Sequence, residues 1–168
     1  MDQPDDDQRT AVQQQSSADR LLASSSKSFM AAYYGYFRQC SLDKAIKCVE
    51  NAVQCAILSK EYGYALHCYE SMIRDLNAVR PRYQDETVVQ YFLLKLINGS
   101  VEADHERTQT QLESFDFRSD SAVFRYLNNA VKIIRSGQNQ GELFQITEIP
   151  HNIYIFQLLY VLLQKKTV

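Results

Sequence analysis

Apolar residues recur every three or four positions along most of this chain, the spacing that lines one face of an α-helix. In the segment 45–57, for example, Val49, Val53 and Ile57 share a face, while Lys47 and Glu50 lie opposite. With only 5 Gly and 3 Pro in 168 residues, the chain has little material for the many tight turns of a sandwich or barrel. The pattern therefore predicts an all-α protein.

Start and stop signals divide this pattern into separate helices. Ser41 precedes one apolar run as an N-cap, Gly99 and Gly137 interrupt two others, and Pro81 and Pro150 mark places that a helix does not cross. The predicted helices cover residues 18–37, 42–57, 64–76, 87–97, 101–112, 122–135, 142–149 and 152–165.

Short connections make successive helices antiparallel neighbours. The breaks at Tyr62, Ser100 and Gln138 follow one another at intervals of about 38 residues, within the period range of helical-pair solenoids. After the first break, the small residue Ala65 is followed one turn later by Tyr69, as in the tetratricopeptide pattern. The sequence thus predicts antiparallel helix pairs stacked as a short tetratricopeptide-like solenoid or bundle.

The amino-terminal segment differs from the rest. Residues 1–17 are rich in Asp, Gln and Ser and have almost nothing to bury, so they cannot offset the entropy lost on ordering. We expect a disordered tail over 1–17 and one helical-repeat domain over 18–168, since the chain is long enough for one core but short for two.

Charge and cysteine usage exclude several classes. A net charge of -2 leaves no positive field for a phosphate backbone, so nucleic acid is not expected as a partner. The 4 cysteines lack the short paired spacings of zinc or redox sites, which favours buried free thiols in a reducing, cytoplasmic environment. The longest apolar run, 153–163, is interrupted by Gln157 and is too short to span a membrane.

Catalytic chemistry has no convincing signal. Neighbouring residues on a helix point about 100° apart, so His67 and Cys68 would not share a site. His105 lies directly between Asp104 and Glu106, whereas metal ligands on a helix need three- or four-residue spacing. The sequence predicts a non-enzymatic protein with no catalytic, cofactor-binding or metal-binding residues.

Two aromatic segments are candidates for partner binding. Tyr33, Tyr34, Tyr36 and Phe37 surround much of one helix and cannot all enter a single core, although a half-buried stripe with solvated hydroxyls explains them equally well.

The terminal helix is apolar nearly all round, whereas the last helix of a lone stack normally has a polar outer face. A second protein is therefore expected to cover it. The candidate residues there are Tyr154, Phe156, Leu159 and Tyr160.

Four segments between 42 and 164, namely 51–76, 109–117, 124–127 and 158–164, contain scattered apolar residues in a shared register. On these residues the chain resembles the family of the forty-kilodalton huntingtin-associated protein. It implies a non-catalytic subunit that is clamped between the helical-repeat lobes of huntingtin and stabilises it. It also implies a link to endosomal trafficking, indirectly through an endosomal small GTPase, with nuclear or endosome-associated localisation beside the cytoplasm.

That family belongs to the wider alpha-SNAP-like helical-repeat group, and the end of this chain, 117–121 through 165–168, is also similar to the carboxyl-terminal bundle of alpha-SNAP. The chain is much shorter than members of either family. Two alternatives remain: an adaptor that recruits the membrane-fusion ATPase, and a generic tetratricopeptide module that binds peptides.

Overall fold

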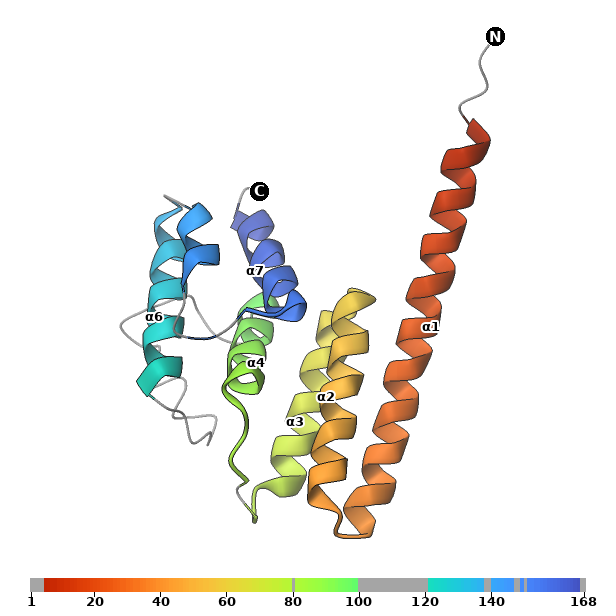
Figure 1. Ribbon diagram of the computed structural model, residues 1–168, viewed down its shortest axis with the longest axis vertical. Coiled ribbons are helices and arrows are strands. Elements are labelled where there is room, and N and C mark those ends of the chain that lie inside the picture. Colours follow the sequence, from red (N-terminus) through yellow and green to blue (C-terminus); the bar gives the residue numbers. More distant parts are fainter. Residues whose placement is uncertain are drawn as a thin grey trace. The chain divides into compact units, whose positions relative to one another are not determined.

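The computed structural model describes residues 5–79, 81–99, 121–137, 140–146, 149 and 151–166. Its described residues contain six α-helices and one 3-10 helix, and Figure 1 shows them in chain order. They are α1 (Asp5–Arg38), α2 (Leu42–Leu58), α3 (Tyr62–Leu76), α4 (Asp85–Ile97), α6 (Ser121–Ser136), the 3-10 helix η1 (Gln140–Gln145) and α7 (Ile153–Lys166).

The predicted all-α class is confirmed, with neighbouring helices packed as antiparallel pairs. The sequence predicts a short helix over 142–149. The structure has a 3-10 helix at Gln140–Gln145 there instead, which is shorter than predicted. The predicted helix over 101–112 lies outside the described residues. α1 begins at Asp5 and so extends through 5–17, and the disorder of that segment in solution stays a prediction.

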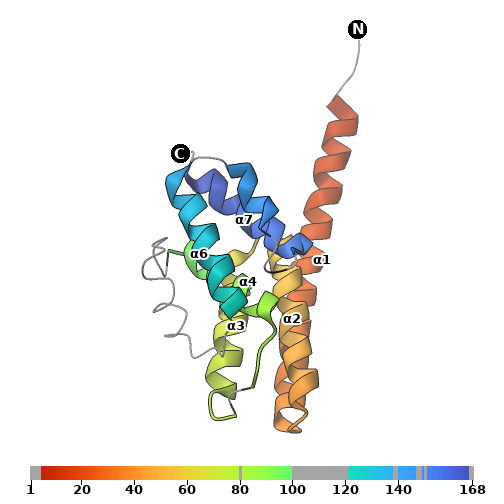
Figure 2. The same ribbon diagram turned by 60° about the vertical axis from the view of Figure 1, so that its left-hand side comes forward.

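The chain divides into two compact units, Met1–Met72 (unit 1) and Ile73–Val168 (unit 2). Unit 1 contains α1, α2 and most of α3, and α1 and α2 run side by side in both views (Figures 1 and 2). Since α1 has 34 residues and α2 has 17, about half of α1 continues beyond its partner.

The turns that join the helices of unit 1 have the same geometry. Cys40 has a φ of 57° after α1, and Lys60 has a φ of 63° after α2. In the first turn the amide of Ser41 donates to the carbonyl of Tyr36 at 3.0 Å, and in the second that of Glu61 donates to Ala56 at 2.8 Å. These are the six-to-one hydrogen bonds of Schellman motifs, which close each helix within two residues.

One hydrogen bond joins α1 to α2 inside the core of unit 1. The hydroxyl of Ser26, fully buried in α1, donates to the carbonyl of Ala52 in α2 at 2.6 Å. The thiol of Cys68 in α3 also bonds to Ser26, so this small hydroxyl meets all three helices. A buried hydroxyl needs partners, and it therefore fixes the register in which the helices pack.

The four cysteines are free, but the structure corrects the expectation that all are buried. Cys68 is buried, Cys48 and Cys55 are half-buried, and Cys40 is exposed. Cys40 differs because it lies in the turn after α1, where its side chain leaves the apolar face of the helix pattern.

We expect the thiols to react in the order of their exposure. Burial raises the pKa of Cys68 to about 12, and it raises the pKa of Cys48 and Cys55 to a smaller extent. Because the thiolate is the reacting form, Cys40 should be alkylated first at pH 8 and Cys68 only when unit 1 unfolds. Mass spectrometry after a timed iodoacetamide pulse measures this; early labelling of Cys68 in the native chain would contradict its burial.

Unit 2 is built around α4, which contacts both α6 and α7. Its residues from Thr87 to Leu94 are all buried, including the polar Thr87 and Gln90. From α6, Tyr126 and Leu127 enter the core of unit 2, and α7 contributes a stripe of Ile155, Leu158, Leu159 and Leu162.

The two ends of α7 are held by polar contacts. Asn152 is its N-cap, since its side-chain oxygen accepts the amide hydrogen of Ile155 at 2.9 Å. At the other end, the ammonium group of Lys165 donates to the carbonyl of Ile97, the last residue of α4. This contact offsets the negative end of the α4 dipole and fixes α7 against α4. None of the described helices is both long and apolar enough to cross a membrane.

Candidate functional site

The predicted aromatic residues of α1 divide into buried and exposed ones. Tyr33 is completely buried in unit 1, with its ring 5.0 Å from that of Tyr34 and 5.9 Å from that of Phe37. Tyr36 and Phe37 are half-buried, and the ammonium group of Lys44 lies over the Tyr36 ring at 5.7 Å. Only Tyr34 is clearly exposed, so this segment contributes more to the core than to a free surface.

The residues predicted on the terminal helix divide in the same way. Leu159 is completely buried and packs inside unit 2, and Tyr154 is half-buried. Phe156 and Tyr160 are exposed by 40% and 58%, and Ile153, one turn before Phe156, is exposed by 63%. These three exposed residues are spaced three and four apart, so they lie on one side of α7.

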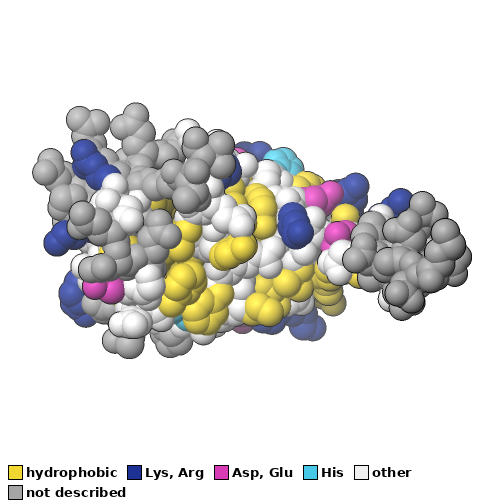
Figure 3. All heavy atoms as spheres, turned by 90° about the horizontal axis from the view of Figure 1, so that it is seen from above, with side chains coloured by type: hydrophobic (Ala, Val, Ile, Leu, Met, Phe, Trp, Pro, Cys, Tyr) yellow, Lys and Arg dark blue, Asp and Glu magenta, His cyan; other side chains and the backbone are white. Residues whose placement is uncertain are grey.

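Phe144 of η1 extends this exposed side. It is exposed by 37%, and its ring stacks on that of Phe156 with a centroid distance of 5.6 Å and an interplanar angle of 25°. We call Phe144, Ile153, Phe156 and Tyr160 together the α7 face. Figure 3 shows one face of the molecule, on which several apolar side chains reach the surface.

Ring contacts that His151 makes with Phe156 and with the buried Tyr126 support the α7 face. The ring of His151 meets Phe156 edge-on at 4.9 Å and Tyr126 edge-on at 5.5 Å. The hydroxyl of Tyr126 lies 2.8 Å from Nε2 of His151, which accepts its hydrogen in the neutral tautomer that carries its proton on Nδ1. Since Tyr126 is fully buried, these contacts fix the position of Phe156 in advance of any binding.

We expect unit 2 to lose stability as the pH falls below 6.5. Burial lowers the pKa of His151 from its ordinary value of 6.5, so the unfolded chain binds more protons than the folded one in this range. The loss begins at 6.5 and ends below the lowered pKa of the folded state. Thermal unfolding at a series of pH values measures it.

His151→Gln is the matched variant for this experiment, because its side-chain carbonyl can still accept the Tyr126 hydroxyl hydrogen without titrating. Its melting temperature should vary less with pH between 7.5 and 5.5 than that of the wild type. An identical pH profile in both proteins would show that His151 does not cause the loss.

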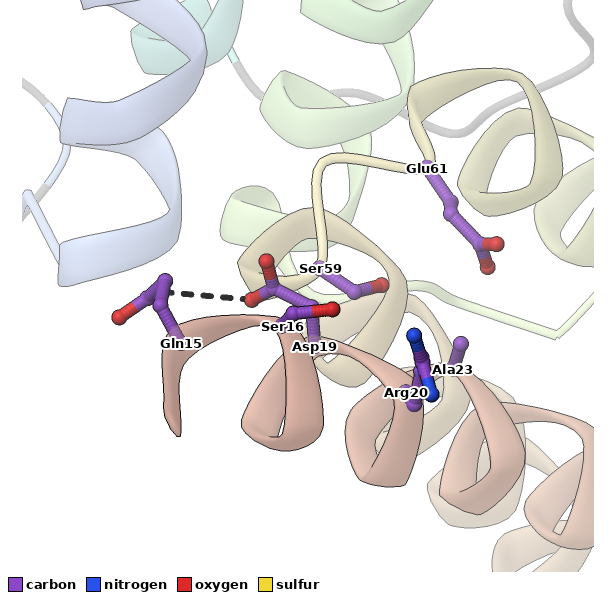
Figure 4. A pocket seen from close by; sticks show the side chains of 7 residues that line it. All are labelled: Gln15, Ser16, Asp19, Arg20, Ala23, Ser59 and Glu61. Atoms are coloured by element: carbon purple, nitrogen blue, oxygen red, sulfur yellow. Dashed lines mark hydrogen bonds between the residues drawn. The ribbon is translucent and has the colours of Figure 1, made fainter. Parts of the chain in front are cut away.

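Unit 1 contains a second candidate, an open groove of about 450 Å³ between α1 and the α2–α3 turn. Figure 4 shows Gln15, Ser16, Asp19, Arg20 and Ala23 of α1 opposite Ser59 and Glu61 of the turn. Gln15 donates a hydrogen bond to Asp19 at 3.3 Å.

The groove offers no clear ligand chemistry. Its charged groups are of both signs, and none of its lining side chains is buried, so water solvates them. The α7 face is the stronger candidate, because exposed aromatic side chains held in a fixed position are typical of binding hot spots.

The described residues also bear on metal binding and catalysis. Among the described residues, no three His, Cys, Asp or Glu side chains are placed to hold a metal ion. The rings of Tyr64 and His67 lie 6.0 Å apart at the surface of α3, while Cys68 points into the core. His105, considered as a ligand from the sequence, lies outside the described residues.

Sequence reasoning did not include Tyr126, Phe144 and His151 in the site. They come from α6, η1 and the residue pair before α7. Tyr126 and His151, which are in contact, lie 25 positions apart in the sequence. No periodic pattern relates such positions. The only local signal is that His151 precedes an N-cap residue, Asn152, which places it at the entrance of the terminal helix.

Comparison with known proteins identifies no relative. No family model matches the chain, and no match was found among curated proteins or among solved structures.

Proposed function

We propose that this chain is a non-enzymatic interaction subunit that binds and stabilises a large helical-repeat protein through the α7 face. The exposure of Ile153, Phe156 and Tyr160 on one side of a terminal helix carries the proposal. Large side chains of this kind cost free energy when they stay in water, and burying them contributes about 25 cal/mol per Å². A complex in which a partner covers these side chains is therefore stabilised in proportion to the apolar area that becomes buried.

Huntingtin is the proposed partner, through the resemblance of residues 42–164 to the family of its forty-kilodalton associated protein. In this proposal, the helix pairs form a short tetratricopeptide-like, alpha-SNAP-like stack. The shared turn geometry after α1 and α2 supports such a stack, because equal turns give successive helices the same relation to one another. The location would then be cytoplasmic and endosome-associated.

Co-purification with huntingtin tests the proposal. We expect the double variant Phe156→Asp, Tyr160→Asp to lower the affinity at least 30-fold, since truncating a hot-spot residue costs about 2 kcal/mol or more. Binding of purified huntingtin by the wild type and the variant is measured by biolayer interferometry.

The control is Leu21→Asp in α1. Leu21 is exposed by 70% and belongs to unit 1, so the change adds one negative charge, of the same sign as the two in the double variant, outside the α7 face. The control should bind as the wild type does. Equal affinity of the double variant would disprove the role of the α7 face, and failure of the wild type to bind would remove huntingtin as the partner. Stimulated hydrolysis by the membrane-fusion ATPase would favour the adaptor alternative instead.

A further inference from the structure

The helix α4 ends in an Asn98–Gly99 pair that lies at the surface of unit 2. Asn98 is the C-cap of the helix, with a φ of -87° and a ψ of 5°, and both residues are exposed. Gly99 follows in the left-handed backbone region, with a φ of 68°. This turn favours glycine, because a side-chain Cβ is strained at such a φ. The exposed asparagine amide therefore has a glycine as its neighbour, the pairing in which this amide is chemically least stable.

The reaction open to this pair is deamidation. The backbone nitrogen of Gly99 attacks Cγ of Asn98, the new N–Cγ bond closes a succinimide ring, and Nδ2 leaves as ammonia with the proton of the attacking amide. Water then adds to either carbonyl of the ring and opens it. The products are aspartate, or isoaspartate in which the main chain runs through the side-chain carbon. Because glycine has no Cβ, its nitrogen reaches Cγ with the least steric hindrance.

The contacts of the native turn oppose this reaction. Nδ2 of Asn98 donates to the carbonyl of Leu94 at 2.8 Å, and the amide of Gly99 donates to the carbonyl of Leu96 at 3.2 Å. The leaving group and the nucleophile are thus both held by hydrogen bonds. A ψ of 5° also turns the nitrogen of Gly99 toward the backbone nitrogen of Asn98, whereas the ring closes only on the Cβ side. The turn must therefore open before the amide reacts.

A residue of α7 holds the same turn closed. The ammonium group of Lys165 donates to the carbonyl of Ile97, the residue before Asn98. Both helices belong to unit 2 and contact one another there. A hydrogen bond from a charged donor stabilises the closed turn, so its loss raises the fraction of time that the turn is open.

We infer that Asn98 is a site of spontaneous deamidation whose rate is controlled by the contact of Lys165 with the end of α4. The modification weakens the turn in which it occurs. A carboxylate at position 98 cannot donate to Leu94, and it lies at the negative end of the α4 dipole. Because no residue of the α7 face takes part, the inference holds or fails independently of the proposed function.

Incubation of the full-length chain in mildly alkaline buffer, with and without guanidinium chloride, tests the inference. Peptide mapping by liquid chromatography and mass spectrometry follows the exchange of each amide NH₂ for a hydroxyl and separates aspartate from isoaspartate. Asn77 is the internal control, because it is also exposed in a turn, after α3, but Ala78 follows it. In guanidinium chloride we expect Asn98 to react about tenfold faster than Asn77, since the Cβ of alanine hinders the attack.

Without guanidinium chloride, the reaction of Asn98 should be slower than in the unfolded chain. Lys165→Met should accelerate this native reaction about fivefold and leave the rate in guanidinium chloride unchanged, because only the closed turn contains the lost hydrogen bond. Lys165→Arg retains a cationic donor and should react more slowly than Lys165→Met. Lys132→Met removes an exposed charge from α6 of the same unit and should react as the wild type does.

Equal rates of Asn98 and Asn77 in guanidinium chloride would overturn the assignment of the site. Equal native rates of the wild type and Lys165→Met would overturn the control by α7. The effect of the product is measured with Asn98→Asp, in which the amides of the last turn of α4 should exchange with solvent about tenfold faster than in the wild type. Unchanged exchange would contradict the weakening of the turn.

Discussion

Leu159→Asp should unfold unit 2, whereas Phe156→Asp, one turn earlier on the same helix, should leave it folded. Leu159 is completely buried in the core of unit 2. Replacing a buried leucine by alanine alone costs about 2–5 kcal/mol, and an unpaired carboxylate at such a position adds its desolvation. The total approaches the whole stability of a small domain.

Phe156→Asp removes a half-exposed ring instead. It loses the stacking on Phe144, a contribution of about 1 kcal/mol, and part of this is recovered because Asp in the first turn of α7 faces the positive end of its dipole. Hydrogen exchange measured by mass spectrometry separates the two variants. Amides of α4, α6 and α7 should exchange freely in Leu159→Asp and stay protected in Phe156→Asp, and equal protection would contradict the burial of Leu159.

Tyr33→Ala should destabilise unit 1 by about 3–5 kcal/mol, the range for removing a large aromatic side chain from a core. Tyr33 is completely buried and contacts the rings of Tyr34 and Phe37. Its loss leaves a cavity in the core of unit 1 that the rigid helix backbone fills only in part. Segment-resolved hydrogen exchange at increasing urea concentrations reports the stability of unit 1.

The adjacent Tyr34→Ala is the control, since Tyr34 is exposed by 39% and lies at the surface of the same helix. It should change the stability by less than about 1 kcal/mol. A similar loss in both variants would mean that the two rings stabilise unit 1 together through their 5.0 Å contact rather than by the burial of one.

The positions of α2, α3, α4, α6 and α7 followed from the sequence because each depends on local patterns, whereas the predicted helix over 142–149 is a 3-10 helix at Gln140–Gln145. The stripe of Val49, Val53 and Ile57 is buried as its spacing predicts, and Gly99 and Gly137 adopt the positive φ expected at the ends of α4 and α6. Ser41 takes the N-cap position before α2, although its side chain makes no capping hydrogen bond. Its amide instead completes the motif that ends α1.

Which aromatic residues face the core and which face solvent was harder to predict. Tyr33 and Tyr34 are neighbours of the same type, and only the packing of α2 and α3 against α1 decides which of them is buried. On α7, the apolar residues all round the helix gave no polar stripe to mark the outer side. For this reason the sequence does not distinguish the buried Leu159 from the exposed Phe156, and it gives no signal for the contact of His151 with Tyr126.

The turns after α1 and α2 are positions at which substitution is expected to make the protein more heat-resistant. Cys40 and Lys60 both sit in the left-handed backbone region, where a side-chain Cβ costs roughly 1 kcal/mol that glycine avoids. Glycine at either position would keep the hydrogen bonds that close the turn, since these use backbone atoms only. At position 40 the same replacement would also delete the exposed thiol, which removes a route to oxidative cross-linking during storage.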